Sequence, residues 1–397
     1  MIDVVFYFQV HQPYRLRRLQ PSDEVRDLDI WDTELNRLVV ERVAARCYLP
    51  MNRVLLEAIE RTDGEFRCAF SLSGTVIRQL RDWAPEALDS FVALAESGCV
   101  EFLCETSRHG LPSLACPEEF AAQVEQQRAT VTELFGRPST FRNTELIMDN
   151  EICRQVEALG FDCMLGEGAD RLLGWRSAQV PYRPQGCERL KLLLRSYSLS
   201  DDIAFRFSNP DWPGFPLFAE TFAQWLHELP PTAQFVGLFM DYETFGEHQS
   251  QQTGIFEFMR HLPELVLTDR SYRFRTPAQV CSERAVVHDL DVSPAVSWAD
   301  EERNLSAWLG NPMQRAVHER IYGMRDAVLA AAASQPALLE HWRDLTTSDH
   351  VYYIATKHHS DAEVHDYFSP YDSPHAAFAT VMSALDALEA VVAGARR

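Results

Sequence analysis

The side chains in this sequence that could do chemistry stand where apolar, strand-like runs end. Residues 238–248, LFMDYETFGEH, begin as such a run and continue into five ionisable groups, of which Asp241 is the first. Glu145 follows another run, within FRNTELI, and His11 ends the first run of the chain. Two carboxyl groups in one site can act as a nucleophile and as a general acid and base, and a histidine beside them can contact the substrate.

Each of these residues also has a structural explanation. Glu145 could be a helix-entry carboxylate that the helix dipole stabilises, and Asp241 could cap a helix that continues through Thr244. His11 could be a hydrogen-bonded group at the end of a buried strand. A half-buried carboxylate is costly unless it is paired or hydrogen-bonded, so two of them at strand ends favour a shared functional site.

The elements that would position these groups are predicted from a repeated pattern over residues 1–280. Short apolar runs alternate there with helical patterns, which predicts parallel strands joined by right-handed crossovers. About seven such runs favour a closed barrel over an open sheet, and no GxGxxG follows the first run, so a dinucleotide-binding fold has no support. The runs lie at residues 3–10, 65–72, 99–106, 138–145, 161–167, 189–198 and 234–241.

A parallel barrel would gather the polar groups at one place, because the C-terminal ends of all its strands open at the same mouth. We therefore expect His11, Glu145 and Asp241 to lie close together there. The third run holds Glu101 inside it and ends near Glu105, so it is expected to bring a carboxylate to the same mouth.

The pattern changes to helices after about residue 295. Asn311 is expected to cap a helix that Pro312 starts, and the last helix is expected to begin at Ser373-Pro374. These helices predict a bundle that packs on the barrel. The predicted regions are a catalytic barrel over residues 1–285, a linker within 288–302 and a C-terminal helical domain over 295–397.

One carboxylate interrupts a helical stripe in this second region. Leu338, Trp342 and Leu345 step along one helix face, and Asp349 stands where the next apolar side chain is expected. Asp349 could line a polar pocket. Alternatively, Ser348 or Asp349 could cap a new helix after a break.

Composition and charge limit the class of protein. The chain has 397 residues, 46% of them apolar, and its net charge of −21 makes nucleic acid and anionic membranes poor partners without repelling a neutral sugar. No secretory signal is recognisable, and no stretch reaches the roughly 18 apolar residues of a membrane helix. Nine cysteines without a CxxC pair predict reduced thiols in a cytoplasmic protein, and no His/Cys set has the spacing of a metal site.

Five segments, in this order, resemble the signature segments of glycoside hydrolase family 57, most closely its compact amylase-like branch. The match runs from residue 5 to about residue 378, and DYETFGEH together with FRNTELI is its most specific part. The segments are FYFQVHQPYRL, GCVEFLCETSRHGLPSL, TFRNTELIMDNEI, GLFMDYETFGEH and TTSDHVYYIATKHHSDAEVHDYFSPYDSP.

The resemblance implies a distorted (β/α)7 barrel, followed by a helical domain that completes the active site. It implies retaining cleavage of α-1,4-glucans such as maltodextrin, starch or glycogen, with Glu145 as nucleophile and Asp241 as acid and base. The two carboxyl groups of a retaining site should lie about 5–5.5 Å apart, and neither a metal nor an organic cofactor is implied. The expected substrate contacts are His11, Asp349, Glu101, Arg142 and His350.

The sequence departs from the family pattern at several positions. Gln9 stands where relatives with an HxHQP segment carry a second histidine, and Tyr242 and Thr244 replace the Gly and Lys of many members. His358 stands where close relatives are expected to have Trp, which removes an aromatic wall from a leaving-group subsite. Neither of the two central carboxylates is affected.

Other functions stay open at this level. A 4-α-glucanotransferase uses the same chemistry as an α-amylase-type hydrolase until the acceptor arrives, and branching activity ranks lowest because long extra segments are missing. A non-catalytic α-glucan-binding protein would share the fold. A metal-dependent polysaccharide deacetylase would need an Asp-His-His set, for which HHSDAEVH at residues 358–365 is the nearest segment.

Overall fold

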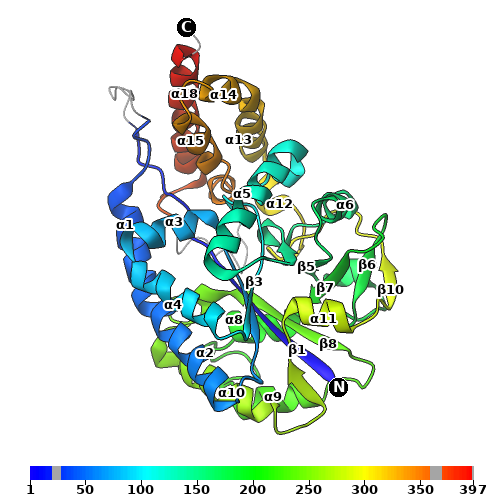
Figure 1. The fold of residues 1–397 in the computed structure, drawn as a ribbon. Coiled ribbons are helices and arrows are strands. Elements are labelled where there is room, and N and C mark those ends of the chain that lie inside the picture. The colour runs from blue at the N-terminus through cyan, green and yellow to red at the C-terminus, as the bar shows by residue number, and fades with distance from the viewer. Residues whose placement is uncertain (20–27, 358–368, 396–397) are drawn as a thin grey trace.

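Seven parallel strands form the centre of the molecule in the computed structural model, which describes residues 1–19, 28–357 and 369–395 (Figure 1). Each of the seven coincides with one of the apolar runs predicted as strands. They are β1 (Ile2–Val10), β2 (Cys68–Leu72), β3 (Val100–Phe102), β4 (Thr140–Arg142), β5 (Cys163–Glu167), β7 (Lys191–Arg195) and β8 (Phe235–Asp241).

The strand pairings return to β1 and so close a barrel. β1 pairs in parallel with both β2 and β8, β2 pairs with β3, β4 with β5, and β5 with β7. Two short contacts complete the ring. A Cys104–Phe141 bridge joins the end of β3 to β4, and Arg195 pairs with Gly237 between β7 and β8. The predicted (β/α)7 barrel is therefore confirmed, and these short contacts are where it is distorted.

Three further strands were not predicted. β6 (Tyr182–Pro184) runs antiparallel to β7 and pairs with β10 (His288–Leu290), while β9 (Tyr272–Phe274) pairs with the first residues of β1. Each has three residues with a charged one in the middle, so none belongs to an apolar run like those that contain β3 and β4.

The first strand shows why the barrel runs are apolar without alternation. All nine residues of β1 are buried. Val5 and Tyr7 pack inside the barrel with Phe239, whereas Phe6 and Phe8 belong to the cluster formed with the surrounding helices. A strand that is covered on both faces needs apolar side chains at every position.

Helices follow the strands and pack around the barrel (Figure 1). Apolar side chains of most of these helices complete the cluster that contains Phe6 and Phe8, whereas Ile152, Leu172 and Val280 lie in the other two buried clusters. These helices are α1 (Thr33–Val43), α2 (Leu49–Arg61), α3 (Gly74–Trp83), α4 (Pro85–Glu96), α5 (Pro117–Phe135), α6 (Asn150–Ala158), α7 (Asp170–Leu173), α8 (Tyr197–Ala204), α9 (Ala219–His227), α10 (Ile255–Val266) and α11 (Pro277–Glu283).

The second region is helical, as predicted, and Figure 1 shows its longer helices gathered at the end of the molecule away from the N-terminus. The Asn311 side chain accepts a hydrogen bond from the Gln314 N–H (2.9 Å) and Pro312 begins the helix that follows, so the predicted cap is confirmed. The helices are α12 (Ser306–Leu309), α13 (Pro312–Gly323), α14 (Arg325–Ala332), α15 (Ala337–Leu345), α16 (Asp349–Tyr352) and α18 (Pro374–Ala395).

The hydrophobic core continues across the boundary predicted between the two regions. Phe141 and Met164 of the barrel belong to the same buried cluster as Trp308 and Trp342 of the helical region. The segment predicted as a linker forms part of this core, because Val296 is buried in the same cluster. The two regions therefore share one hydrophobic core. Their division into two separate domains remains a prediction.

The last helix, α18, is long and apolar enough to cross a membrane, judged by length and composition alone, which corrects the expectation that no stretch would be. In the fold, Val381, Leu385 and Leu388 are buried in the shared cluster, and the helix contacts α13, α14 and α15. Packing as the core helix of this region accounts for its apolar composition.

The shared core leads to a prediction about truncation. A chain that ends at residue 290 would expose the barrel side of the cluster, including Phe141 and Met164, and would lose Val296. We expect this chain to be insoluble or to lack a cooperative thermal transition, because each large buried side chain contributes about 2–3 kcal/mol of burial. Circular dichroism and size-exclusion chromatography measure this. A soluble chain 1–290 with a cooperative transition like that of the full chain would contradict the shared core.

Candidate active site

A cavity opens at the mouth of the barrel, where the parallel strands have their carboxyl ends. His11, Glu145, Asp241 and Asp349 all line this cavity, so the fold brings together predicted residues that lie up to 338 positions apart. We call it the inner cavity. Its lining residues are Gln9, His11, Gln12, Pro13, His109, Glu145, Asp241, Glu243, His248 and Asp349.

Glu145 reaches the inner cavity through a left-handed turn of the backbone. After β4, the 3-10 turn Thr144–Leu146 places Glu145 at a φ of 57°. This conformation costs a residue with a side chain roughly 1–2 kcal/mol, so neighbouring contacts must hold it. The Asn143 side chain donates to the Ile147 carbonyl (2.8 Å), and the Trp298 backbone N–H donates to the Glu145 carbonyl (3.1 Å).

Two N–H groups face the carboxylate of Glu145, a residue that is only 7% exposed. His109 Nε2 lies 3.0 Å from Oε1, and Trp298 Nε1 lies 2.7 Å from Oε2. Hydrogen bonds donated to a carboxylate favour its charged form. The two donors therefore orient both oxygens and favour the charged form of this carboxyl group.

The charge on His109 depends on a second carboxylate, Glu105, whose Oε2 lies 2.8 Å from Nδ1. Burial by itself disfavours the imidazolium, but the hydrogen bonds with Glu105 and Glu145 outweigh it and raise the pKa of His109 to about 9. Both ring nitrogens therefore donate at neutral pH. Burial acts to raise the pKa of the fully buried Glu105, but its bonds with His109 and Gln9 prevail and lower it.

His11 stacks on His109, with ring centroids 4.1 Å apart. Burial, and then the charge of His109, lower the pKa of His11, so this ring is neutral and has one N–H. His11 Nε2 lies 3.0 Å from Asp349 Oδ2, and Nδ1 lies 2.7 Å from Ser73 Oγ, so Nε2 donates and Nδ1 accepts. Asp349 is also the first residue of α16, so it both begins a helix and lines the cavity.

Asp241 ends β8, in register with Gln9 of β1. The turn that follows, Tyr242–Thr244, has no side-chain cap from Asp241, so the capping explanation is wrong. The Asp241 side chain lines both the inner cavity and a second pocket beside it.

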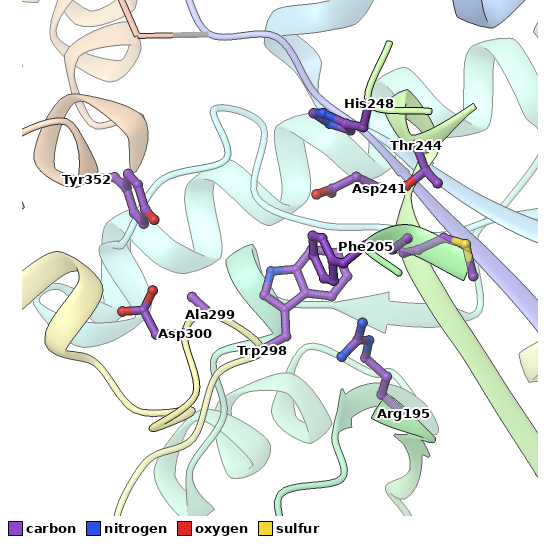
Figure 2. A pocket seen from close by; sticks show the side chains of 11 residues that line it. Arg195, Phe205, Asp241, Thr244, His248, Trp298, Ala299, Asp300 and Tyr352 are labelled. Atoms are coloured by element: carbon purple, nitrogen blue, oxygen red, sulfur yellow. The ribbon is translucent and has the colours of Figure 1, made fainter. Parts of the chain in front are cut away.

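The second pocket, which we call the outer pocket, shares Asp241 and His248 with the inner cavity. Figure 2 shows Asp300 and Tyr352 on the side of this pocket opposite Thr244 and His248, with Trp298 between the two sides. The outer pocket is lined by Arg195, Ala204, Phe205, Met240, Asp241, Thr244, His248, Trp298, Ala299, Asp300 and Tyr352.

Glu243 is a buried carboxyl group in the wall of the inner cavity. The Tyr48 hydroxyl donates to its Oε1 (2.5 Å). Burial, and then the charge of Asp241, raise the pKa of Glu243 to about 8, so it carries a proton at neutral pH. Glu243 therefore adds no negative charge to the wall beside Asp241.

One predicted substrate contact, Glu101, does not reach the inner cavity. Its carboxylate accepts hydrogen bonds from Thr140 Oγ1 (2.5 Å) and from the Ala278 backbone N–H (2.9 Å), which stand at the starts of β4 and α11. These contacts lie at the end of the barrel away from the mouth. The carboxylate that the third run brings to the site is Glu105, and Glu101 supports α11 instead.

Arg142 and His350 also lie behind the cavity wall. Arg142 is fully buried, and its guanidinium carbon lies 4.8 Å from the centroid of the Trp298 ring. His350 lies near Trp31, with centroids 6.1 Å apart, and burial lowers the pKa of His350 to about 4. Arg142 is close to Glu145 in the sequence, and His350 directly follows Asp349. Neighbouring side chains of a strand or helix point in different directions, so neither residue enters the cavity.

The two residues that hold the Glu145 carboxylate, His109 and Trp298, were not predicted. His109 lies four positions after Glu105 within the quoted segment ETSRHG, and this His–carboxylate spacing was the available signal. Trp298 lies in the segment predicted as a linker, where no periodic pattern marks it. The role of Trp298 is seen only in the folded structure, where its indole N–H donates to Glu145.

Within residues 1–19, 28–357 and 369–395, no group of three or more His, Cys, Asp or Glu side chains is arranged to hold a metal ion. His358, and the segment HHSDAEVH that offered the nearest metal-ligand pattern, lie outside the described residues.

Comparison with known proteins gives one family. Residues 5–291 match the family model described as glycosyl hydrolase family 57. A protein of Methanocaldococcus jannaschii that carries a provisional name as an alpha-amylase is 37% identical over 396 residues, which cover 96% of this chain and 83% of that protein.

Solved structures that are similar in fold include a 4-alpha-glucanotransferase and a branching enzyme. The 4-alpha-glucanotransferase of Thermococcus litoralis has a TM-score of 0.69 at 15% identity, with 88% of this chain and 56% of that chain covered. The family 57 type branching enzyme of Pyrococcus horikoshii has a TM-score of 0.68 at 14% identity, with 92% and 87% covered. This chain thus spans little more than half the length of the glucanotransferase, and at these identities the likeness concerns the fold.

The raised pKa of His109 predicts how stability depends on pH. His109 takes up its proton near pH 6.5 when unfolded and near pH 9 when folded, so its contribution is fully present below about pH 6.5 and is lost as the pH rises through about 9. The free energy of unfolding should fall over this range by up to about 3 kcal/mol.

Urea denaturation at several pH values measures this fall. In a His109→Gln variant the decline between pH 6.5 and pH 9 should be reduced. A His227→Gln variant, which changes a half-buried histidine hydrogen-bonded to the Val266 carbonyl, serves as the matched control and should follow the wild type. Parallel curves for the wild type and His109→Gln would contradict the assigned charge.

Proposed function

Because the chain belongs to glycoside hydrolase family 57, we propose that it is a retaining enzyme that cleaves α-1,4-glucans by double displacement. Maltodextrin, starch or glycogen would be the substrate, and the reaction is hydrolysis of the α-amylase type or 4-α-glucanotransfer. The observation that carries the proposal is that Glu145 and Asp241, from two distant strand ends, line one cavity in which N–H groups of His109 and Trp298 face both oxygens of Glu145.

Glu145 is the nucleophile in this proposal. Its carboxylate oxygen attacks the anomeric carbon, the bond to the departing sugar oxygen breaks, and a glycosyl-enzyme forms. The donors on its two oxygens, His109 and Trp298, keep it ionised before attack. The same donors stabilise it again as the carboxylate that leaves in the second half of the reaction.

Asp241 is the general acid and then the general base. It protonates the departing oxygen and later removes a proton from the acceptor, so the same side chain serves both half-reactions. Its position on the boundary between the inner cavity and the outer pocket supports this role, because the departing and entering groups must both reach it.

His11 and Asp349 position the reacting sugar. Both line the inner cavity, and the hydrogen bond between them fixes the Asp349 carboxylate while leaving it able to accept from sugar hydroxyls. Contacts with hydroxyls away from the reacting carbon help to orient the sugar for attack.

The alternative of a non-catalytic α-glucan-binding protein explains less of the site. A binding protein needs hydroxyl acceptors but has no use for a carboxylate held between an imidazolium and an indole N–H. We also propose a cytoplasmic location, which is supported by nine cysteines that are all unpaired and, with the exception of Cys116, buried.

The first test of the proposed function is the configuration of the product. Double displacement inverts the anomeric carbon twice, so the new reducing end formed from a maltooligosaccharide should have the α configuration. Proton NMR within the first minutes, before mutarotation, measures the α to β ratio. Initial release of the β-anomer would exclude the covalent route.

A second prediction separates the two carboxylates. Glu145→Gln and Asp241→Asn should each lower kcat on maltooligosaccharides by on the order of 10³-fold or more, while thermal unfolding stays cooperative. On an α-glucosyl fluoride, whose leaving group needs no acid, added azide should take the place of the missing carboxylate. Glu145→Ala should then yield the β-azide by direct attack, and Asp241→Ala the α-azide by attack on the glycosyl-enzyme. The reverse pattern would exchange the two roles.

A further inference from the structure

The outer pocket lies on the acid–base side of the site. It shares Asp241 and His248 with the inner cavity, but Glu145, His11 and Asp349 do not line it. If the sugar that becomes bound to Glu145 occupies the inner cavity, the outer pocket is the space on the other side of Asp241. In a retaining mechanism the departing and the entering groups both bind on that side.

The walls of the outer pocket are largely apolar. Phe205 directly follows α8 and is 41% exposed, and Met240, Trp298 and Ala299 also line the pocket. The C–H faces of a glucose ring can pack on such side chains, and covering Phe205 would remove apolar area from water.

Polar groups also line the outer pocket. Asp300 is 5% exposed and has a φ of 59°, and Tyr352 lines the pocket beside it (Figure 2). Backbone strain of this kind persists only where the surrounding structure holds it. The pocket thus combines an aromatic surface with a few fixed polar groups, which is the composition that binds a small polar ring in one orientation.

We propose that the outer pocket is the acceptor-sugar site, and that Phe205 determines how the glycosyl-enzyme divides between transfer to a glucan chain and hydrolysis. This inference rests on the proposed function. The 4-hydroxyl oxygen of the acceptor forms a bond to the anomeric carbon as the bond from that carbon to Glu145 breaks, and the hydroxyl proton passes to Asp241. Transfer leaves the number of reducing ends unchanged, whereas hydrolysis adds one per cleavage.

The test uses maltoheptaose as donor and isotopically labelled maltose as acceptor. Labelled longer products report transfer, and new reducing ends in the same reaction report hydrolysis. Phe205→Ala should raise the maltose concentration for half-maximal transfer about tenfold, as expected when the apolar contact of one ring is removed, and should lower the transfer-to-hydrolysis ratio in proportion. The departing part of maltoheptaose uses the same pocket, so the donor KM should rise as well, and the ratio is therefore measured at saturating donor.

Two variants control for structural effects. Phe205→Tyr keeps the aromatic face and should retain the wild-type ratio. Phe218→Ala removes another exposed phenylalanine, 57% exposed and directly before α9, which does not line the outer pocket, and should leave the ratio unchanged.

The outcomes separate this inference from the proposed function. Donor consumption with an unchanged ratio in Phe205→Ala, or with hydrolysis alone in the wild type at every maltose concentration, would overturn the inference and leave the glycosidase assignment standing. A wild-type protein that consumes no α-glucan would overturn the proposed function, and the acceptor site with it.

Discussion

The mouth of the barrel depends on one chain of buried hydrogen bonds, which runs from Gln9 through Glu105, His109 and Glu145 to Trp298. At its centre, the imidazolium of His109 lies between the carboxylates of Glu105 and Glu145, and all three groups are buried. Each of these charges alone would be expensive to bury, and each is stabilised only because the others are present. The chain joins β1, the loop after β3, the turn after β4 and the segment that begins the helical region. The orientation of Glu145 is therefore a property of four distant parts of the sequence at once.

The helical region also contributes to the site, because Asp349 lines the inner cavity. Asp349 meets His11 across 338 positions of sequence, and the hydrophobic core runs through both regions. Buried charges also anchor the connecting segment. Arg195 donates to Glu167 (3.4 Å), and Arg303 lies 3.6 Å from the other oxygen of this fully buried carboxylate. Because this segment carries Trp298, ion pairing at the buried Glu167 helps to place the second donor to Glu145.

The sequence was informative where a residue's position followed from the regular geometry of an element. Glu145 and Asp241 end strand-like runs, and parallel strands must bring such ends to one mouth, so their convergence was predictable. Glu101 was misplaced because it lies inside its strand, where the mouth cannot be reached. His109 and Trp298 lie in irregular segments whose paths depend on tertiary contacts. The hydrogen bond from Trp298 to Glu145 spans 153 positions, and no local pattern encodes such a contact.

Trp298 links the two halves of the site physically. Its indole N–H holds the Glu145 carboxylate, its ring lines the outer pocket, and the Arg142 guanidinium packs over that ring. A sugar ring in the outer pocket would displace water from beside this hydrogen bond and lower the local dielectric, which strengthens the bonds to the carboxylate. In the proposed mechanism, the charge returns to Glu145 when the glycosyl-enzyme breaks down. An acceptor bound against Trp298 would therefore promote the step in which it is consumed, an advantage that a single water molecule cannot supply.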